Sequence, residues 1–374
     1  MRVDKSKWQK IFLGEVCNLY QPKTIATSCL DSNGKYLVYG ANGVIGKYNE
    51  YNHKFPEVLI TCRGATCGTI NISKPFSWIN GNAMVVHPKE ENLLDFAFLG
   101  KAVSAIDYSK VITGAAQPQI TRANLQKVQI VIPTLVEQQT IASELDAVQE
   151  MIDGYKAQIA DLDALAQSIF LDMFGNVSMN DKSWNIIPMG KLGDFKNGLN
   201  YNKGEQGKSI KIIGVGDFQN IKSLSFFNDI SSIEVEHISE EYLLHNEDIV
   251  FVRSNGNKNL VGRCLEVYPN DAEVTFSGFC IRFRKSVEIS NKYLIALLTD
   301  SGFKKTHLLK SNGIGIQNIN QKLLSSLPIP VPSADLQQLF ALKVETIEQQ
   351  KEQLRLQLQD AETLMAERMQ YYFS

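Results

Sequence analysis

The residues that could carry out chemistry are few and scattered along the 374-residue chain. No two of the five histidines lie at metal-ligand spacing. Cys62 and Cys67 have no second cysteine pair with which to complete a zinc site. In a chain of this length the six cysteines are expected to be reduced thiols rather than a disulfide framework. The spacing therefore argues against a metal centre.

Two further motifs resemble catalytic ones but lack necessary parts. The glycine-rich run at 40–48 has five residues before its Gly-Lys pair, and Tyr48 stands where Ser or Thr would hold magnesium. The Asp-Phe-Lys run at 194–196 resembles a nuclease cluster, but the corresponding residue in the first half of the chain is Asn18. The sequence has no Asn-Pro-Pro-aromatic run for methyl transfer to a base and no glycine-rich turn for S-adenosylmethionine. We therefore predict no active site in this chain.

Polar residues after apolar runs could instead recognise DNA. Arg63 and Arg253 each follow such a run, and we align them as matching positions at a shift of 190 residues. Arg, Asn and Gln can each make two hydrogen bonds to one base edge. For any single residue, an ordinary role at a strand end or on the surface is the alternative. The candidate DNA-contacting residues are Lys47, Tyr48, Arg63, Thr66, Gln117, Gln119, Arg122, Arg253, Asn255, Asn257, Lys258, Arg263, Gln317 and Asn318.

These loops belong to two copies of one plan. The run that starts at Trp8 reappears from Trp184 at a shift of 176 residues, and Gly81 matches Gly278 at a shift of 197. From Pro133, which matches Pro332, the shift stays at 199 to the end of the helices. A shift that only grows and then stays constant indicates an ancestral unit repeated in tandem.

Each copy has two parts with different hydrophobic periods. Short β-branched and aromatic runs such as KYLVYG, EVLITC and DIVFVR predict strands, with short helices at 92–105 and 291–309. A long helical pattern follows in each copy. We predict a mixed α/β (α+β) fold with a pseudo-two-fold repeat. Its globular domains are expected at 1–133 and 176–332, and its long helices at 134–175 and 333–374.

The apolar positions of both long helices alternate in spacings of four and three, as in the seam of a coiled coil. We expect the two seams to pack on each other; an antiparallel pairing is reasonable and a parallel one stays open. In the antiparallel case Lys351 would lie near Leu162, between Asp161 and Asp163, and the alternative is that it reaches out to solvent. The predicted packing residues are Ile141, Leu145, Val148, Ile152, Ile159, Leu162, Val344, Ile347, Leu354 and Leu358.

The formal net charge of −2 averages over unlike parts. Residues 1–118 carry a net +4 and residues 184–318 a net +1, whereas the helical segments 134–174 and 333–374 carry −7 and −3. DNA phosphates would repel acidic helices, so any nucleic acid is expected to meet the globular parts. Their positive charge is too small for tight binding through phosphates alone, so a basic partner is expected to help. Charge by itself leaves open two ordinary domains on an acidic stalk.

With these features the chain resembles the specificity subunit of type I restriction–modification systems. The resemblance covers nearly the whole chain and rests on the order of its parts. Each copy opens with a tryptophan run, and the first contains YGANGVIGKYNEY and ITCRGATCGT. Each then closes with AAQPQI or GIQNI, a proline, and a Gln-Gln pair entering the helix. Leu336 departs from the family pattern where the first copy has Glu137, and Lys351 and Arg368 interrupt the second seam.

The resemblance implies two target recognition domains held apart by an antiparallel pair of long helices. Each domain would read one half of a bipartite target in double-stranded DNA, and the helices would set the spacing and dock two methyltransferase subunits. The chain would be a non-catalytic subunit without a cofactor of its own. S-adenosylmethionine for adenine-N6 methylation, and ATP and magnesium for the motor–endonuclease subunits, would be bound by its partners. Because the two copies differ in loops and length, we expect an asymmetric target.

The N-terminal residues lack the apolar core of a signal peptide, and no window approaches 18 uninterrupted apolar residues. We therefore expect a cytoplasmic protein with no membrane partner. Three other functions remain open. A self-sufficient restriction enzyme would need a carboxylate cluster or methyl-donor loop, and none is found. A coiled-coil scaffold for proteins, or a DNA-specificity subunit of a related phage-defence system, would fit the same layout.

Overall fold

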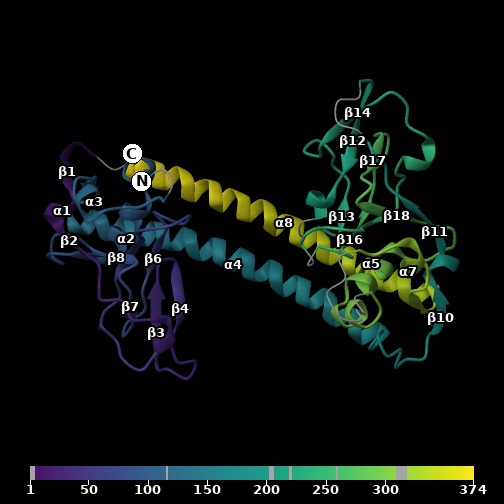
Figure 1. Cartoon of the computed structure of the whole chain (residues 1–374), viewed down its shortest axis with the longest axis horizontal. Helices are drawn as coiled ribbons and strands as arrows, with labels where there is room; N and C mark the ends of the chain where they lie inside the picture. Colours follow the sequence, from purple (N-terminus) through teal and green to yellow (C-terminus); the bar gives the residue numbers. More distant parts are fainter. Residues whose placement is uncertain (1–4, 115–116, 202–205, 219–220, 258–259, 309–317) are drawn as a thin grey trace. The chain divides into compact units, whose positions relative to one another are not determined.

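The computed structural model describes residues 5–114, 117–201, 206–218, 221–257, 260–308 and 318–374. The chain divides into two compact units: unit 1 comprises Met1–Ala157 and Arg355–Ser374, and unit 2 comprises Gln158–Leu354. Each unit combines a mixed α/β part with segments of two long helices, α4 (Leu135–Phe174) and α8 (Ala334–Phe373) (Figure 1). The expected fold class is thereby confirmed.

Unit 1 is built around an antiparallel sheet of β2 (Cys17–Tyr20), β8 (Ala83–Pro88), β5 (Val58–Thr61) and β6 (Ile70–Ile72), in that order. Helix α2 (Phe96–Ser104) covers one face, where Val58 and Ile60 are buried. A second sheet covers the other face, where Leu59 is buried. Successive strand residues point to opposite faces, so β5 is buried throughout. The second sheet consists of β4 (Gly43–Tyr48), β3 (Tyr36–Gly40) and β7 (Trp78–Ile79).

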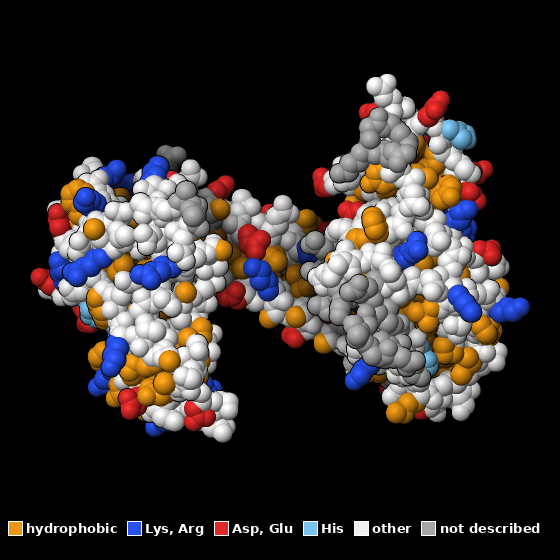
Figure 2. Space-filling view, in the orientation of Figure 1, with side chains coloured by type: hydrophobic (Ala, Val, Ile, Leu, Met, Phe, Trp, Pro, Cys, Tyr) orange, Lys and Arg blue, Asp and Glu red, His pale blue; other side chains and the backbone are white. Residues whose placement is uncertain are grey.

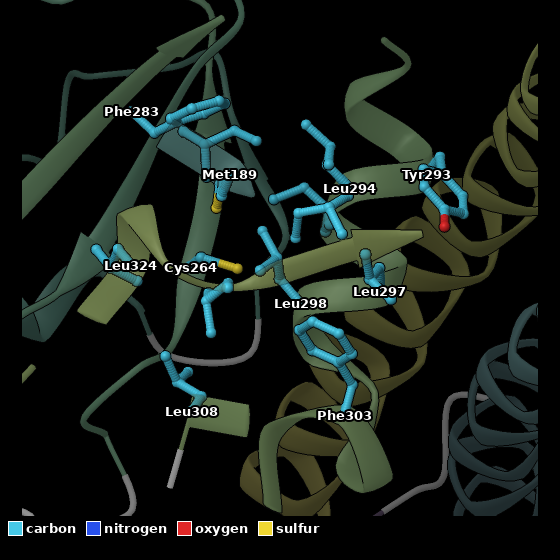
Figure 3. Packing of buried hydrophobic residues seen from close by; sticks show 14 of the residues in the cluster. Met189, Cys264, Phe283, Tyr293, Leu294, Leu297, Leu298, Phe303, Leu308 and Leu324 are labelled. Carbon is cyan, nitrogen blue, oxygen red and sulfur yellow. The ribbon is translucent and has the colours of Figure 1, made fainter. Parts of the chain in front are cut away.

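Unit 2 repeats this layered plan around a larger sheet. Ile249 and Phe251 of its central strand pack beneath helix α5 (Asn291–Thr299), while Val250 and Val252 face a second, three-stranded sheet. Figure 3 shows the helix side of this core, to which Cys264, Leu298, Phe303 and Leu308 all belong. The strand order of the main sheet is β11 (Gly193–Asn197), β18 (Cys280–Lys285), β15 (Asp248–Val252), β16 (Cys264–Val267) and β13 (Ser223–Leu224). The strand order of the second sheet is β14 (Ser232–Val235), β12 (Lys208–Ile213) and β17 (Val274–Phe276).

Smaller elements complete each unit. A two-stranded sheet precedes each long helix: β1 (Gln9–Phe12) with β9 (Gln129–Ile132), and β10 (Asn185–Pro188) with β19 (Pro328–Val331). The short helices are α1 (Leu13–Val16), α3 (Arg122–Leu125), α6 (Ser301–Phe303) and α7 (Gln321–Ser325), with a π-helical turn η7 (Lys304–Leu308). The 3-10 turns are η1 (Lys5–Lys7), η2 (Thr27–Cys29), η3 (Tyr108–Lys110), η4 (Met189–Lys191), η5 (Val215–Phe218) and η6 (Glu240–Tyr242).

The short helices differ from their predicted bounds. The helix expected at 92–105 begins at Phe96, because Asp95 accepts a hydrogen bond from Phe98 N and caps the helix there. The helix expected at 291–309 is broken at Asp300, whose extended backbone starts a new short helix and accepts a hydrogen bond from Phe303 N. An acidic capping residue inside an apolar run was the available signal for both boundaries.

The long helices run antiparallel to each other within unit 1. Each has 40 residues, a length of about 60 Å. Tyr372, near the end of α8, donates a hydrogen bond of 2.6 Å to Glu144, near the start of α4. Arg368 forms an ion pair of 3.1 Å with the same carboxylate. Further along α4 and earlier along α8, Ile152 and Ala361 share a buried cluster.

Unit 2 shows the same direction at the other ends of the helices. Phe170 and Phe174 of α4 pack against Phe340, near the start of α8. Lys351 is only 4% exposed, and its Nζ lies 2.7 Å from Asp163 Oδ1 and 3.0 Å from Glu348 Oε1. The antiparallel pairing is thus confirmed in each unit. The alternative in which Lys351 extends into solvent is wrong.

All ten predicted packing residues are buried or half-buried. Near its C-terminal end α4 also buries Phe170 and Phe174, which lie beside the predicted seam rather than in it. The widened stripe arises because this end of α4 packs on α8 and on the globular core of unit 2 together. A pattern with two apolar residues in every seven describes a helix that packs against one other helix. It therefore does not predict the additional buried positions.

A buried glutamine ties each long helix to its globular part. Gln138 is fully buried; its Oε1 accepts from Asp95 N at 2.8 Å, and its Nε2 donates to Leu93 O and Pro133 O. Gln337 makes the matching contacts in unit 2, accepting from Ser290 N and donating to Pro332 O. The side chain therefore fixes the angle at which the helix leaves the sheet.

The residue before each glutamine differs between the copies. Glu137 closes a capping box with Thr134, whose backbone N donates to Glu137 Oε2 at 2.9 Å. Leu336, its counterpart, packs instead against the hydrophobic core of unit 2. This departure from the family pattern replaces a helix cap with an apolar contact.

We predict that Gln138→Leu lowers the free energy of unfolding by about 2–3 kcal/mol, because it leaves the part-buried Asp95 N and two carbonyl groups without their partner. Gln139→Leu is the matched control, since Gln139 is exposed, and we expect a change within about 0.5 kcal/mol. Denaturant unfolding followed by circular dichroism measures both. Equal effects of the two substitutions would contradict the proposed anchoring role.

Candidate nucleic-acid interface

Loop A, residues 62–69, connects β5 to β6 in unit 1. Its base is closed by hydrogen bonds of 2.9 Å from Gly68 N to Thr61 O and from Thr61 N to Thr69 O. The segment 117–120 lies alongside it: Arg63 forms a β-bridge with Gln119, and Gly64 N donates to Pro118 O at 3.1 Å. Residues more than 50 positions apart in the sequence therefore share one surface.

Loop B connects β15 to β16 in unit 2, and its described residues are 253–257 and 260–263. Its base is closed in the same way, by bonds of 2.9 Å from Gly262 N to Val252 O and from Val252 N to Arg263 O. Ser254 forms a β-bridge with Asn318, the counterpart of the bridge in loop A. Both units therefore build a polar loop against a returning segment at the same place in the fold.

The alignment of Arg63 with Arg253 is wrong by one residue. Ile120 N donates to Cys62 O, and the corresponding Ile319 N donates to Arg253 O, both at 2.9 Å. Arg253 therefore matches Cys62. The bridges made by Arg63 and Ser254 match each other. Because both faces of β5 and β15 are covered, their central residues are apolar on both faces and carry no alternation that could fix the register.

Four of the unit 1 candidates gather at loop A. Arg63, Thr66, Gln117 and Gln119 are all exposed on the loop or the segment beside it. Arg122 is exposed at the first position of α3, directly after Thr121, whose Oγ1 caps that helix. The arrangement offers several hydrogen-bonding side chains to one ligand.

Lys47 and Tyr48 do not join this group. They lie at the end of β4. The turn between β3 and β4 is the part that contacts β5, because Thr61 Oγ1 donates a hydrogen bond to Ala41 O there. Gly43 and Tyr48 mark the two ends of the strand, about 16 Å apart at 3.3 Å per residue. Tyr48 instead packs edge-on against Trp78, with 5.4 Å between ring centroids.

The unit 2 candidates differ in how far they are already engaged. Arg253 is half-buried and its Nη1 lies 3.4 Å from Gly278 O, while Arg263 Nη1 donates to Phe218 O at 3.2 Å. Asn255 Oδ1 accepts from Asn257 N at 2.7 Å and thereby shapes the loop. Asn318 is exposed. Lys258 and Gln317 lie outside the described residues.

The thiols near loop A are not arranged for metal binding or nucleophilic attack. Burial raises the pKa of Cys62 to about 11, and burial also raises the pKa of Cys67, so both are protonated at neutral pH. In the described part of the chain no three His, Cys, Asp or Glu side chains lie close enough together to hold a metal ion. What these loops offer is hydrogen bonding.

An exposed aromatic cluster in unit 1 was not predicted from the sequence. Tyr51, Phe55 and Phe76 are 43%, 64% and 42% exposed, and the Tyr51 ring lies 5.0 Å from Tyr36 and 5.2 Å from Phe76. Tyr36 belongs to β3, and Figure 2 shows hydrophobic side chains gathered on the part of unit 1 where Figure 1 draws β3 and β4. The tyrosine-rich run at 48–51 was the available signal.

Charge is mixed over the globular parts. On the face shown in Figure 2, Lys and Arg side chains are scattered over both units with acidic and neutral side chains between them. Several lysines are already paired, among them Lys101 with Asp146, Lys196 with Glu241 and Lys292 with Glu266. These pairs reduce the field that distant phosphates would feel. Among the described helices, none has the length and apolar character needed to span a membrane.

Comparison with known proteins assigns the repeat to one family. The family model described as "Type I restriction modification DNA specificity domain" matches residues 5–163 and 181–360. The type I restriction enzyme StySPI specificity subunit of Salmonella potsdam is 26% identical over 337 residues, which cover 83% of this chain and 68% of that protein. The MjaVIII specificity subunit of Methanocaldococcus jannaschii is 20% identical, with 91% and 86% covered.

A solved structure shares the fold. The crystal structure of the type I restriction-modification system S subunit from M. genitalium superposes with a TM-score of 0.63 at 16% sequence identity, covering all of this chain and 98% of that one. The similarity of fold agrees with the layered units and long helices described above.

We predict that Gly262→Ala destabilises unit 2 by about 1–3 kcal/mol. Gly262 has a φ of +75°, and an added Cβ would lie 2.7 Å from Leu308 Cδ2, so both the backbone and the contact at the base of loop B would be strained. Gly256→Ala, in the same loop but with open space around it, should change stability by less than about 0.5 kcal/mol. Thermal unfolding compares them, and a Gly262→Ala protein as stable as its control would contradict the strained geometry.

Proposed function

The chain belongs to the family of type I restriction–modification DNA specificity domains, and we propose that each of its units reads one half of a bipartite DNA target. The observation that carries this proposal is the pair of loops A and B. Their backbones are closed and bridged alike, yet their side chains differ. A common frame that presents different hydrogen-bonding groups suits recognition of two different base sequences.

Gln119 and Asn318 are the clearest example of a shared position that carries different side chains in the two units. They occupy the same bridged position in the two units and both are exposed. Either amide can pair with an adenine edge through two hydrogen bonds, but Gln reaches one methylene further than Asn. The neighbouring positions differ more strongly, since Arg63 matches Ser254. We therefore propose a target whose halves are not related by symmetry.

The long helices are proposed to set the distance between the half-sites and to dock two methyltransferase subunits. Apolar residues left exposed along them support a docking role: Val136 is 73% exposed on α4, and Leu339 and Leu342 are 49% and 58% exposed on α8. Leu339 and Leu342 lie one turn apart on the same helix face. Exposed apolar side chains on an otherwise acidic helix suit a protein partner better than DNA.

Catalysis is proposed to reside in the partners. Methylation of adenine would use S-adenosylmethionine bound by the methyltransferase subunits, and cleavage would use ATP and magnesium bound by the motor–endonuclease subunits. This chain would hold the DNA and orient those subunits on it. The Asp-Phe-Lys run at 194–196 agrees with this division. Its lysine, Lys196, is paired with Glu241 instead of standing free beside a carboxylate cluster.

Single-molecule sequencing of host DNA with and without this gene tests the proposal. We expect adenine methylation to disappear at one gapped, asymmetric motif when the gene is deleted, and to return with the intact gene. A palindromic motif would contradict the asymmetric target. If no modified motif changes, and the chain with its partners protects no defined DNA footprint, the protein-binding scaffold becomes the better hypothesis.

The division of labour between the units gives a second prediction. Gln119→Ala should relax methylation specificity in one half of the motif only, and Asn318→Ala in the other half only, each by about 1–3 kcal/mol of discrimination. Gln139→Ala, which alters an exposed glutamine on α4, serves as the control and should leave the motif unchanged. Loss of discrimination in both halves from one substitution would contradict one-unit-per-half reading.

A further inference from the structure

The surface of unit 1 contains a groove of about 790 Å³. Residues of α2, α3 and β9 line it, together with Phe373 at the end of α8 (Figure 1). Its walls include the apolar side chains of Ala102, Ile106 and Val111. Binding pockets in proteins commonly enclose about 300–1,000 Å³, so the groove has room for a short peptide segment.

One wall of the groove is the outer edge of β9. Leu13 N donates to Val128 O, directly beyond the paired residues of β1 and β9. Because hydrogen-bonded positions alternate along an antiparallel pair, Ile130 faces β1, and the backbone groups of Gln129 and Val131 point away from it. Gln129 and Val131 both line the groove. Among the described residues, no hydrogen bond reaches the backbone N–H or carbonyl group of either.

Unit 2 closes the same edge. At the repeat shift of 199 residues, Gln129 and Val131 correspond to Pro328 and Pro330 of β19. Proline has no backbone N–H to donate. The carbonyl oxygen of Pro330 accepts a hydrogen bond of 2.6 Å from the hydroxyl of Tyr293 on α5. The outer edge of β19 therefore offers little to a further strand.

The matching position on α2 has no hydroxyl. Phe98 corresponds to Tyr293 at a shift of 195 residues, because the backbone N of each donates to the side chain that caps its helix, Asp95 in unit 1 and Ser290 in unit 2. Phe98 cannot donate to Val131 O as Tyr293 donates to Pro330 O. Exposed strand edges pair readily with other chains, and proteins commonly protect them. Unit 1 leaves open an edge that unit 2 protects.

A short segment covers the place in unit 2 that corresponds to the groove. The residues after α4 pack onto the core, where Val177 is 3% exposed. Ser178 O lies 3.4 Å from His307 Nε2, and an added Cβ at Gly302 would lie 2.9 Å from Ser178 Oγ. At the shift of 195 residues Gly302 corresponds to Asp107, which lines the groove. The fold therefore accommodates a peptide with one aliphatic side chain at this place.

The groove in unit 1 is bordered by positive charge. Lys110 and Lys127 line it and are exposed. Asp107 lies 3.4 Å from Lys110, whereas Lys127 forms no ion pair within the described residues. The exposed Val136 follows β9 by four residues, at a position that is Asp335 in unit 2. The groove is thus continuous along the chain with the apolar start of α4, where a methyltransferase subunit is proposed to dock.

We propose that the groove and the open edge of β9 bind a short acidic segment of one methyltransferase subunit, which adds a strand beside β9. Backbone groups of the segment would pair with Gln129 and Val131, as in other cases of strand addition. An aliphatic side chain would enter the groove as Val177 enters the core of unit 2, and a carboxylate would pair with Lys127. This inference rests on the proposed function, and it assigns the contact to unit 1 alone.

The experiment combines the full chain with its methyltransferase subunits and determines by native mass spectrometry how many are bound. The test variant carries Gln129→Pro and Val131→Pro, which remove the two outward N–H groups. Because β19 forms a strand with proline at both positions, we expect this variant to fold. The matched control carries Gln129→Thr and Val131→Thr, which change the same side chains but keep both N–H groups.

The proline variant should bind one methyltransferase subunit about tenfold more weakly than the unaltered chain does, because two backbone hydrogen bonds are lost. Binding of the second subunit should not change, and the threonine control should stay within about twofold. Hydrogen–deuterium exchange in residues 126–132 should slow when the unaltered chain joins its partners, because the outward amides become hydrogen-bonded.

A charge reversal tests the same contact without altering the backbone. Lys127→Glu should weaken binding of the same subunit about threefold to tenfold, because it places a like charge against the acidic segment. Lys23→Glu is the control, since it makes the same change at an exposed lysine of unit 1 outside the groove. Both variants should melt at the temperature of the unaltered chain.

Four results would contradict the inference. One is equal binding by the proline variant and its threonine control, with unchanged exchange in residues 126–132. If the proline variant melts at a lower temperature than its control, the charge reversal decides, and equal binding by Lys127→Glu and Lys23→Glu overturns the inference. Exchange that slows with the concentration of the chain alone would identify a second copy as the occupant. If no methyltransferase subunit binds the unaltered chain, the proposed function fails too, which distinguishes this result from the others.

Discussion

The need to bury two 40-residue amphipathic helices governs the whole chain. Neither small globular part could cover a seam about 60 Å long, so α4 and α8 cover each other. The ion pair of Lys351 with Asp163 then selects one alignment, because a shift by one turn would leave a buried ammonium without its carboxylate. Gln138 and Gln337 transmit this alignment to the sheets.

The two units show how a duplicated fold can diverge without losing its frame. The bonds that close the loops and seat the helices are made by backbone atoms or by the glutamine side chains, and they recur in both copies. Other positions, whose side chains the frame does not use, differ between the copies. Arg63 corresponds to Ser254, and Arg282 is buried on β18 where Val85 lies on β8. Such divergence changes the side chains that the loops and sheets present while the fold stays the same.

The sequence predicted long-range organisation better than local register. Spacings of four and three identified both long helices, and the charge of Lys351 pointed to its acidic partner. The pairing of Arg63 with Arg253 failed because a strand covered on both faces has no alternation to read.

The charges in the helix seam also decide which helix pairs with which. At the repeat shift of 199 residues, two copies of α8 would bring Arg368 against Lys343, a repulsive contact in place of Glu144. Two copies of α4 would set the carboxylates of Glu144 and Asp163 against isoleucines. Only the mixed pair satisfies both charges. The seam charges therefore disfavour pairing of a half-chain with a second copy of itself, and favour one chain that holds two different units over a symmetric dimer of one unit.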